Sequence, residues 1–133
     1  MWPEPVERIA EFLRQSEAQG RLEELPKGVD SPPGPRVRAE AFECYGNAIV
    51  AVVPDDSEID RGSLARRAGC GELRPAAARP FPFQGAQVLV DRSLLSLQTV
   101  WLEAGSSRHV LGLGPRQLLR LTRAATGTFL AGD

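Results

Sequence analysis

Three residues with reactive side chains stand apart in this sequence: Cys44, Cys70 and His109. Zinc sites use closely spaced sets of cysteine and histidine ligands, so these scattered residues do not predict one. No serine-histidine-aspartate spacing surrounds His109, which favours a structural or exposed histidine over a general base. The cysteines form no CxxC pair, and we predict two small, buried, reduced side chains rather than a redox pair or a catalytic thiol. We therefore expect no metal, no cofactor and no protein nucleophile.

Charged side chains are distributed unevenly along the chain. Residues 1–60 carry 6 basic and 13 acidic side chains, whereas residues 61–133 carry 10 basic and 4 acidic ones, and the formal net charge is only −1. The basic residues of the second part are all arginines, whose planar guanidinium groups bind phosphate through paired donors. Two interpretations stay open: a surface that contacts phosphates, and a solvated arginine-rich surface in a chain whose one lysine is Lys27.

Several elements are needed to position such residues, and the stretch 88–124 has the clearest pattern. Apolar runs alternate with turn residues, Asp91 can cap a short helix through its carboxylate, and Gly114-Pro115 is typical of a helix start. Trp101 lies within an apolar run, which favours packing in the interior or at an interface over nucleotide stacking. The pattern predicts a strand at 88–90, a short helix at 93–97, strands at 99–104 and 110–113, and a helix at 115–122.

The remainder of the chain contains fewer but recognisable signals. Gly46-Asn47 between two apolar runs indicates a hairpin, and the proline-rich stretch 30–35 indicates a loop. The predicted elements are a helix at 4–18, a strand at 21–25, hairpin strands at 36–45 and 48–53, a helix at 63–68 capped by Asp60 or Ser63, a strand at 72–74 and an irregular stretch at 75–85. Residues 1–133 are thus expected to form one α+β domain with a mixed, curved, partly barrel-like sheet flanked by helices.

The order and spacing of these residues resemble one family, the prolyl-tRNA-synthetase-associated (YbaK-like) aminoacyl-tRNA editing domains. The likeness is strongest at the C-terminal end and extends over residues 36–124, where Arg79-Pro80-Phe81 is similar to the end of the family's GxxxP loop. Further positions that match the family pattern are Pro54, Asp60, Leu64, Gly69, Asp91, Leu94, Leu95, Gly105, Pro115, Leu118, Leu119, Leu121, Thr122 and Ala124.

This resemblance implies a fold, an activity and partners. Editing domains of this family hydrolyse the ester that joins a wrong amino acid to the 3′ end of a tRNA, and they use no metal. The expected function is therefore a free-standing, trans-acting deacylase of mischarged tRNA. Its partners would be the tRNA acceptor end, bound weakly, and an aminoacyl-tRNA synthetase.

The resemblance also implies which residues form the site. A lysine on the first hairpin strand anchors the phosphate of the terminal adenosine in the family, and Arg38 takes its place here. Ala76, Ala78, Pro80 and Phe81 match the loop that lines the amino-acid pocket, although Ala76 replaces the family's first glycine. The turn at Gly105 and Ser106 borders the site in the same alignment.

These departures from the family pattern leave a second interpretation open. The chain could be a family member that has lost hydrolysis and acts as a tRNA- or protein-binding module, and a weaker alternative is hydrolysis of another small aminoacyl ester. Residues 1–12 lack the basic and apolar regions of a signal peptide, and no apolar run has the length of a membrane span. A cytoplasmic protein without a membrane segment is expected.

Overall fold

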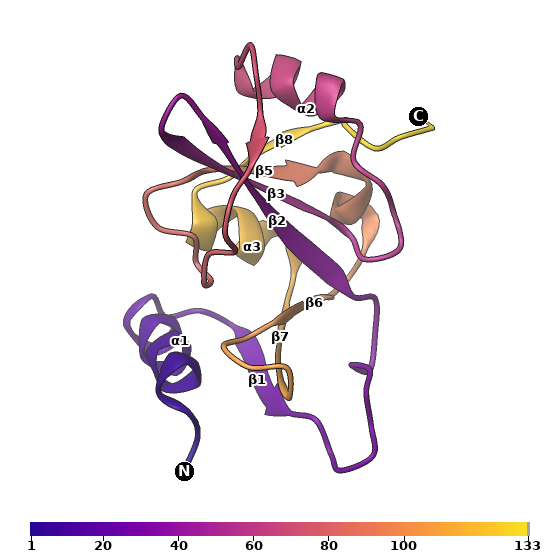
Figure 1. Cartoon of the computed structure of the whole chain (residues 1–133). Helices are drawn as coiled ribbons and strands as arrows, with labels where there is room; N and C mark the ends of the chain where they lie inside the picture. Colours follow the sequence, from indigo (N-terminus) through magenta and orange to yellow (C-terminus); the bar gives the residue numbers. More distant parts are fainter. Residues whose placement is uncertain (133) are drawn as a thin grey trace.

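The structure, a computed structural model that describes residues 1–132, combines two β-sheets with three α-helices (Figure 1). This arrangement confirms the predicted single α+β domain. The elements in chain order are α1 (Glu4–Gln15), β1 (Gly20–Glu24), β2 (Val37–Cys44), β3 (Asn47–Pro54), α2 (Arg61–Ala68), β4 (Arg74–Pro75), β5 (Gln87–Asp91), the 3-10 helix η1 (Arg92–Ser96), β6 (Val100–Glu103), β7 (His109–Leu113), α3 (Pro115–Thr122) and β8 (Ala125–Gly127).

The larger sheet is mixed, as predicted. Its strand order is β4-β2-β3-β5-β8, in which β2 and β3 form the expected antiparallel hairpin while β5 and β8 continue the sheet in parallel. The smaller sheet, β1-β7-β6, is antiparallel throughout. We expected one curved sheet, but the β6–β7 hairpin pairs with β1 instead. A bridge between Arg36 and Trp101 and a 3.0 Å hydrogen bond from the Trp101 N–H to the Pro35 carbonyl connect the two open sheets.

Successive side chains of β3 point alternately into two hydrophobic cores. Val50 and Val52 face the main core, which lies between the two sheets and includes residues of α1 and α3. Ile49, Ala51 and Val53 face the opposite side, where they pack beneath Leu64 of α2. In Figure 1, α2 and α3 accordingly lie on opposite faces of the larger sheet.

Short polar contacts set the ends of several helices. The Asp60 carboxylate accepts a hydrogen bond from the Ser63 N–H at 3.1 Å and caps α2. This hydrogen bond holds the pKa of the Asp60 carboxyl below its usual value. Asp91 caps η1 in the same way, at 3.0 Å from the Ser93 nitrogen, and α3 begins with Pro115 in its first turn. The caps at Asp60 and Asp91 and the start of α3 agree with the sequence predictions, whereas α2 and η1 begin at Arg61 and Arg92, two residues and one residue before the predicted starts.

Some boundaries differ from those expected. Helix α1 ends at Gln15 rather than at residue 18, because Glu17 has φ 51° and turns the chain toward β1. Strand β4 is Arg74–Pro75 rather than 72–74, because Arg74 pairs with Glu43 of β2. Strand β8 was not predicted, since its three small residues carry no periodic pattern and are held by pairing with β5.

The prediction of two reduced cysteines is wrong. Cys44, at the end of β2, and Cys70, just after α2, form a disulfide with their Cα atoms 6.1 Å apart. The sequence could not indicate this pairing, because the cysteines lie 26 residues apart and meet only when α2 packs on the sheet. The disulfide ties the segment that leads into β4 to the end of β2.

Removing this disulfide should lower stability. The crosslink closes a loop of 26 residues, and the chain-entropy relation gives a stabilisation of about 3–4 kcal/mol for a loop of that length. We expect the free energy of unfolding of the double variant Cys44→Ser/Cys70→Ser to be lower by this amount. The variant should therefore unfold at a lower denaturant concentration. The measurement is equilibrium unfolding with and without a dithiol reductant. Equal midpoints for the oxidised wild type and the double variant would contradict the prediction.

Within residues 1–132, no helix has the length and apolar character required to cross a membrane.

Candidate functional site

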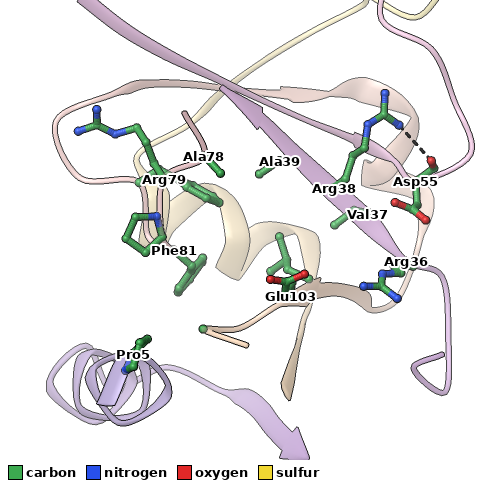
Figure 2. A pocket seen from close by; sticks show the side chains of 14 residues that line it. Pro5, Arg36, Val37, Arg38, Ala39, Asp55, Ala78, Arg79, Phe81 and Glu103 are labelled. Atoms are coloured by element: carbon green, nitrogen blue, oxygen red, sulfur yellow. Dashed lines mark hydrogen bonds between the residues drawn. The ribbon is translucent and has the colours of Figure 1, made fainter. Parts of the chain in front are cut away.

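A hollow of about 480 Å³ opens where β2, the end of β6, the start of α1 and the loop before β5 meet (Figure 2). Two of these walls come from the two different sheets, so the hollow exists only in the folded domain. Its lining residues are Pro5, Arg36, Val37, Arg38, Ala39, Asp55, Ala78, Arg79, Pro80, Phe81, Phe83, Leu102, Glu103 and Gly105.

Arg38 lines this hollow, and its guanidinium makes several contacts with the protein itself. Nη1 donates to the carbonyl oxygens of Pro54, Asp55 and Ser57 at 3.1, 3.0 and 2.6 Å. Nε and Nη2 donate to the Glu40 carboxylate at 3.3 and 3.1 Å. Arg38 therefore holds the turn after β3 against β2, and its side chain keeps 32% of its surface exposed. One Nη2 hydrogen has no assigned acceptor within residues 1–132.

The loop expected to form the amino-acid pocket lies partly in this wall. Ala78, Pro80 and Phe81 line the hollow, whereas Ala76 does not. The Ala76 N–H instead donates to the Ala41 carbonyl at 3.0 Å and continues the pairing of the loop with β2. Phe81 is buried and packs edge-to-face against Phe83, with ring centroids 5.8 Å apart. This aromatic contact anchors the loop on the main core.

Of the two predicted turn residues, Gly105 and Ser106, one lines the hollow and the other does not. Gly105 lines the hollow and has φ 87°, and a Cβ there would lie 2.8 Å from the Val6 nitrogen. Only glycine therefore allows α1 to approach this turn. Ser106 does not line the hollow: its Oγ lies 2.6 Å from His109 Nδ1 and accepts from the Arg108 N–H at 3.1 Å. The buried His109 packs on Trp2, which agrees with a structural histidine.

The sequence interpretation missed four charged residues of the hollow. Arg36, Arg79, Asp55 and Glu103 all line it, and Figure 2 shows them on several sides of the space. Arg36, Arg79 and Glu103 form no ion pair with another residue of the described chain. Arg79 lies in the family-like stretch Arg79-Pro80-Phe81 without being predicted as a site residue. No motif singles out Arg36, Asp55 or Glu103, because the loop 30–35 and the start of β2 bring Arg36 to β6 only in the fold.

A second hollow of about 590 Å³ adjoins the first. Pro5, Ala78, Arg79, Pro80 and Phe81 line both, so the loop forms a shared wall. The walls specific to this second space come from α1 and the end of the loop, and they are Arg8, Ile9, Phe12, Pro82 and Gln84. The site thus pairs a hollow containing both signs of charge with a mainly apolar one.

The residue types in the first hollow limit its chemistry. Its lining contains no serine, threonine, cysteine, histidine, lysine or tyrosine. No group of three or more potential metal ligands gathers anywhere in residues 1–132. Arginines, carboxylates and backbone groups remain, and these can position a substrate or a water molecule and stabilise developing charge.

The sequence matches no known protein-family profile and no curated protein. Solved structures do share the fold. A candidate trans-editing enzyme for prolyl tRNA synthetase is 22% identical, with a TM-score of 0.84 over 99% of this chain and 100% of that chain.

Two further structures extend this comparison. A scaffold protein used for computational epitope grafting is 21% identical, with a TM-score of 0.82 over 99% of this chain and 100% of that chain. A candidate signal transduction protein from Marinobacter aquaeolei VT8 is 18% identical, with a TM-score of 0.74. That match covers 98% of this chain and 31% of the other. Identities this low show a common fold and nothing finer.

Proposed function

We propose that this protein is a trans-acting deacylase that hydrolyses the ester bond of mischarged tRNA. The observation that carries the proposal is the hollow between the two sheets. It gathers Arg38, Ala78, Pro80, Phe81 and Gly105, which the resemblance to editing domains assigns to the site. The fold shared with a candidate trans-editing enzyme supports the same function.

In this proposal, arginines hold the phosphate next to the terminal adenosine. Arg38 is the residue that the resemblance places there, and one of its Nη2 hydrogens is not assigned to a protein acceptor. Arg36 lies on the same wall, and the one hydrogen bond of its side chain within residues 1–132, to the Asp30 carbonyl, is long at 3.5 Å. Arg79 adds a third cation, whose Nη2 also donates to the Gln84 carbonyl at 2.9 Å. Arginine guanidinium groups on the walls of a hollow favour an anionic ligand.

The reaction proceeds by attack of water on the ester carbonyl. The water oxygen bonds to the carbonyl carbon, the bond from that carbon to the ribose oxygen breaks, and the proton that the water loses passes to the ribose oxygen. Because the lining supplies no hydroxyl, thiol or imidazole nucleophile, the protein acts by orienting the ester and the water. Ala78, Pro80, Phe81 and Gly105 supply walls for this purpose.

A second candidate function is a binding module that holds the tRNA end without hydrolysing it. The contacts of Arg38 with Glu40 and with three carbonyl oxygens favour this alternative, because they occupy most of its donors. Both proposals take the cytoplasm as the compartment, the tRNA acceptor end as the main partner and an aminoacyl-tRNA synthetase as a second partner.

The test is a deacylation screen of the purified protein against a panel of correctly and incorrectly charged tRNAs. We expect accelerated loss of one class of mischarged amino acid. A folded protein that leaves every ester intact would refute the enzyme. A titration of labelled tRNA at two salt concentrations then tests the binding module. Each phosphate contact should make log affinity fall against log salt concentration with a slope of about 0.7–0.9. No binding at low salt would refute both functions.

A further inference from the structure

Glu103 is a carboxylate that a site for a purely anionic ligand would not need. It lies at the end of β6, is exposed, and lines the first hollow together with Arg36 and Arg79. A negative group in a phosphate-binding hollow repels the phosphate and weakens the attraction of the neighbouring cations. A carboxylate in this place is useful when the ligand also carries a positive group.

The position of Glu103 is fixed by its strand. Glu103 pairs with Val110 in the β6–β7 hairpin, and the next residue, Ala104, donates its N–H to the His109 carbonyl at 2.9 Å. Gly105, two residues on, is packed against the start of α1. The backbone that carries Glu103 is thus held on both sides. In Figure 2 its carboxylate lies in the space between Arg36 and Phe81.

No protein cation neutralises this carboxylate. No basic side chain of residues 1–132 lies within ion-pair distance of it, whereas Arg38, on the same hollow, pairs with Glu40 at 3.1 Å. Glu103 therefore offers an unpaired negative charge to a ligand, while Arg36 and Arg79 offer unpaired positive charges. A ligand with a phosphate and an ammonium group matches this arrangement.

We propose that Glu103 binds the free α-ammonium group of the aminoacyl ester and so restricts the site to esters of unblocked amino acids. This inference rests on the proposed function and defines its substrate class. The ammonium contacts the Glu103 carboxylate, the phosphate contacts the arginines, and the amino-acid side chain extends past Phe81 toward the adjoining apolar hollow formed by Ile9 and Phe12.

The test compares free and N-acetylated forms of the best aminoacyl-tRNA, because acetylation removes the positive charge and keeps the ester. We expect wild type to hydrolyse the free form at least tenfold faster, since charge-assisted hydrogen bonds are worth roughly this much or more. The variant Glu103→Gln should lose about tenfold on the free form and little on the acetylated form. Glu43→Gln, an exposed carboxylate on β2 outside both hollows, is the matched control and should match wild type.

Each other outcome has a defined meaning. An equal loss on both forms would overturn the proposal and assign Glu103 to water activation instead. Unchanged rates for Glu103→Gln, with hydrolysis intact, would overturn it while leaving the deacylase function standing. A non-hydrolysable probe, an RNA minihelix ending in 3′-aminoacylamino-3′-deoxyadenosine, separates the two proposals. If it binds wild type more tightly than Glu103→Gln while no ester is hydrolysed, the ammonium site stands and the deacylase fails. Equal binding would overturn the ammonium site.

Discussion

Replacing Arg38 with alanine is expected to lower both the stability of the domain and its rate of deacylation. The change removes hydrogen bonds to Glu40 and to the carbonyl oxygens of Pro54, Asp55 and Ser57. Hydrogen bonds to charged groups contribute roughly 1.5–3 kcal/mol, and we expect a loss of about 2 kcal/mol because the guanidinium is partly exposed. The released turn widens the hollow, and the phosphate loses a cation, so single-turnover hydrolysis should slow by about ten- to a hundredfold.

Two further variants separate these effects. Arg38→Lys keeps the charge but cannot reach Glu40 and all three carbonyl oxygens together, so it should recover part of the rate and little of the stability. Arg36→Ala is the matched control for stability, because Arg36 lines the same hollow and makes one long hydrogen bond. It should weaken tRNA binding and leave the unfolding midpoint almost unchanged. Equal stability and equal rates for wild type and Arg38→Ala would contradict this account of Arg38.

Replacing Asp91 with alanine is expected to cause the largest loss of stability among these variants. Asp91 is 2% exposed and ends β5, and its carboxylate accepts from the Ser93 N–H and from the Phe129 N–H at 3.0 and 3.2 Å. Alanine leaves both N–H donors without this partner, together with the Ser93 hydroxyl, which also donates to the carboxylate at 2.5 Å. The Phe129 N–H is buried, and an unsatisfied buried group costs about 1–3 kcal/mol. The free energy of unfolding should therefore fall by roughly 2–5 kcal/mol.

The isosteric variant Asp91→Asn tests the cause. An amide keeps the volume and one acceptor, but its NH₂ group faces one of the two N–H donors. We expect a loss smaller than that of alanine and larger than that of Ser96→Ala, a nearby exposed position whose hydroxyl donates only to the Ser93 carbonyl. Denaturant unfolding of the three variants measures this order. An asparagine variant as stable as wild type would show that the second N–H contact contributes little.

Local signals in the sequence predicted the elements well where a single residue decides the backbone geometry. Asp91 and Asp60 can satisfy free N–H groups, and proline is favoured in the first turn of a helix, so the caps of η1 and α2 and the start of α3 were predicted, with η1 and α2 beginning one and two residues early. Strand β8 and the Cys44–Cys70 disulfide escaped prediction, because each depends on partners that are distant in the sequence.

The site was predicted only in part, for a similar reason. The family pattern led to Arg38, to the loop at 76–81 and to Gly105, and most of these residues line one hollow. It gave no indication of Arg36 or Glu103, because their proximity depends on how β6 sits beside β2. Nor could it indicate that Arg38 holds the turn after β3, since its acceptors are backbone carbonyl oxygens, which leave no trace in residue types.

The proposed function locates hydrolysis of the mischarged tRNA ester in the first hollow itself. Ala78 and Ala77 are neighbours on one exposed loop, but only Ala78 lines the hollows. The most direct measurement is single-turnover deacylation of the best substrate by wild type, Ala78→Trp and Ala77→Trp, with folding checked by thermal unfolding. We expect Ala77→Trp to keep the wild-type rate, whereas Ala78→Trp, which fills the hollow, should lose at least tenfold. Two folded tryptophan variants with equal rates would contradict it.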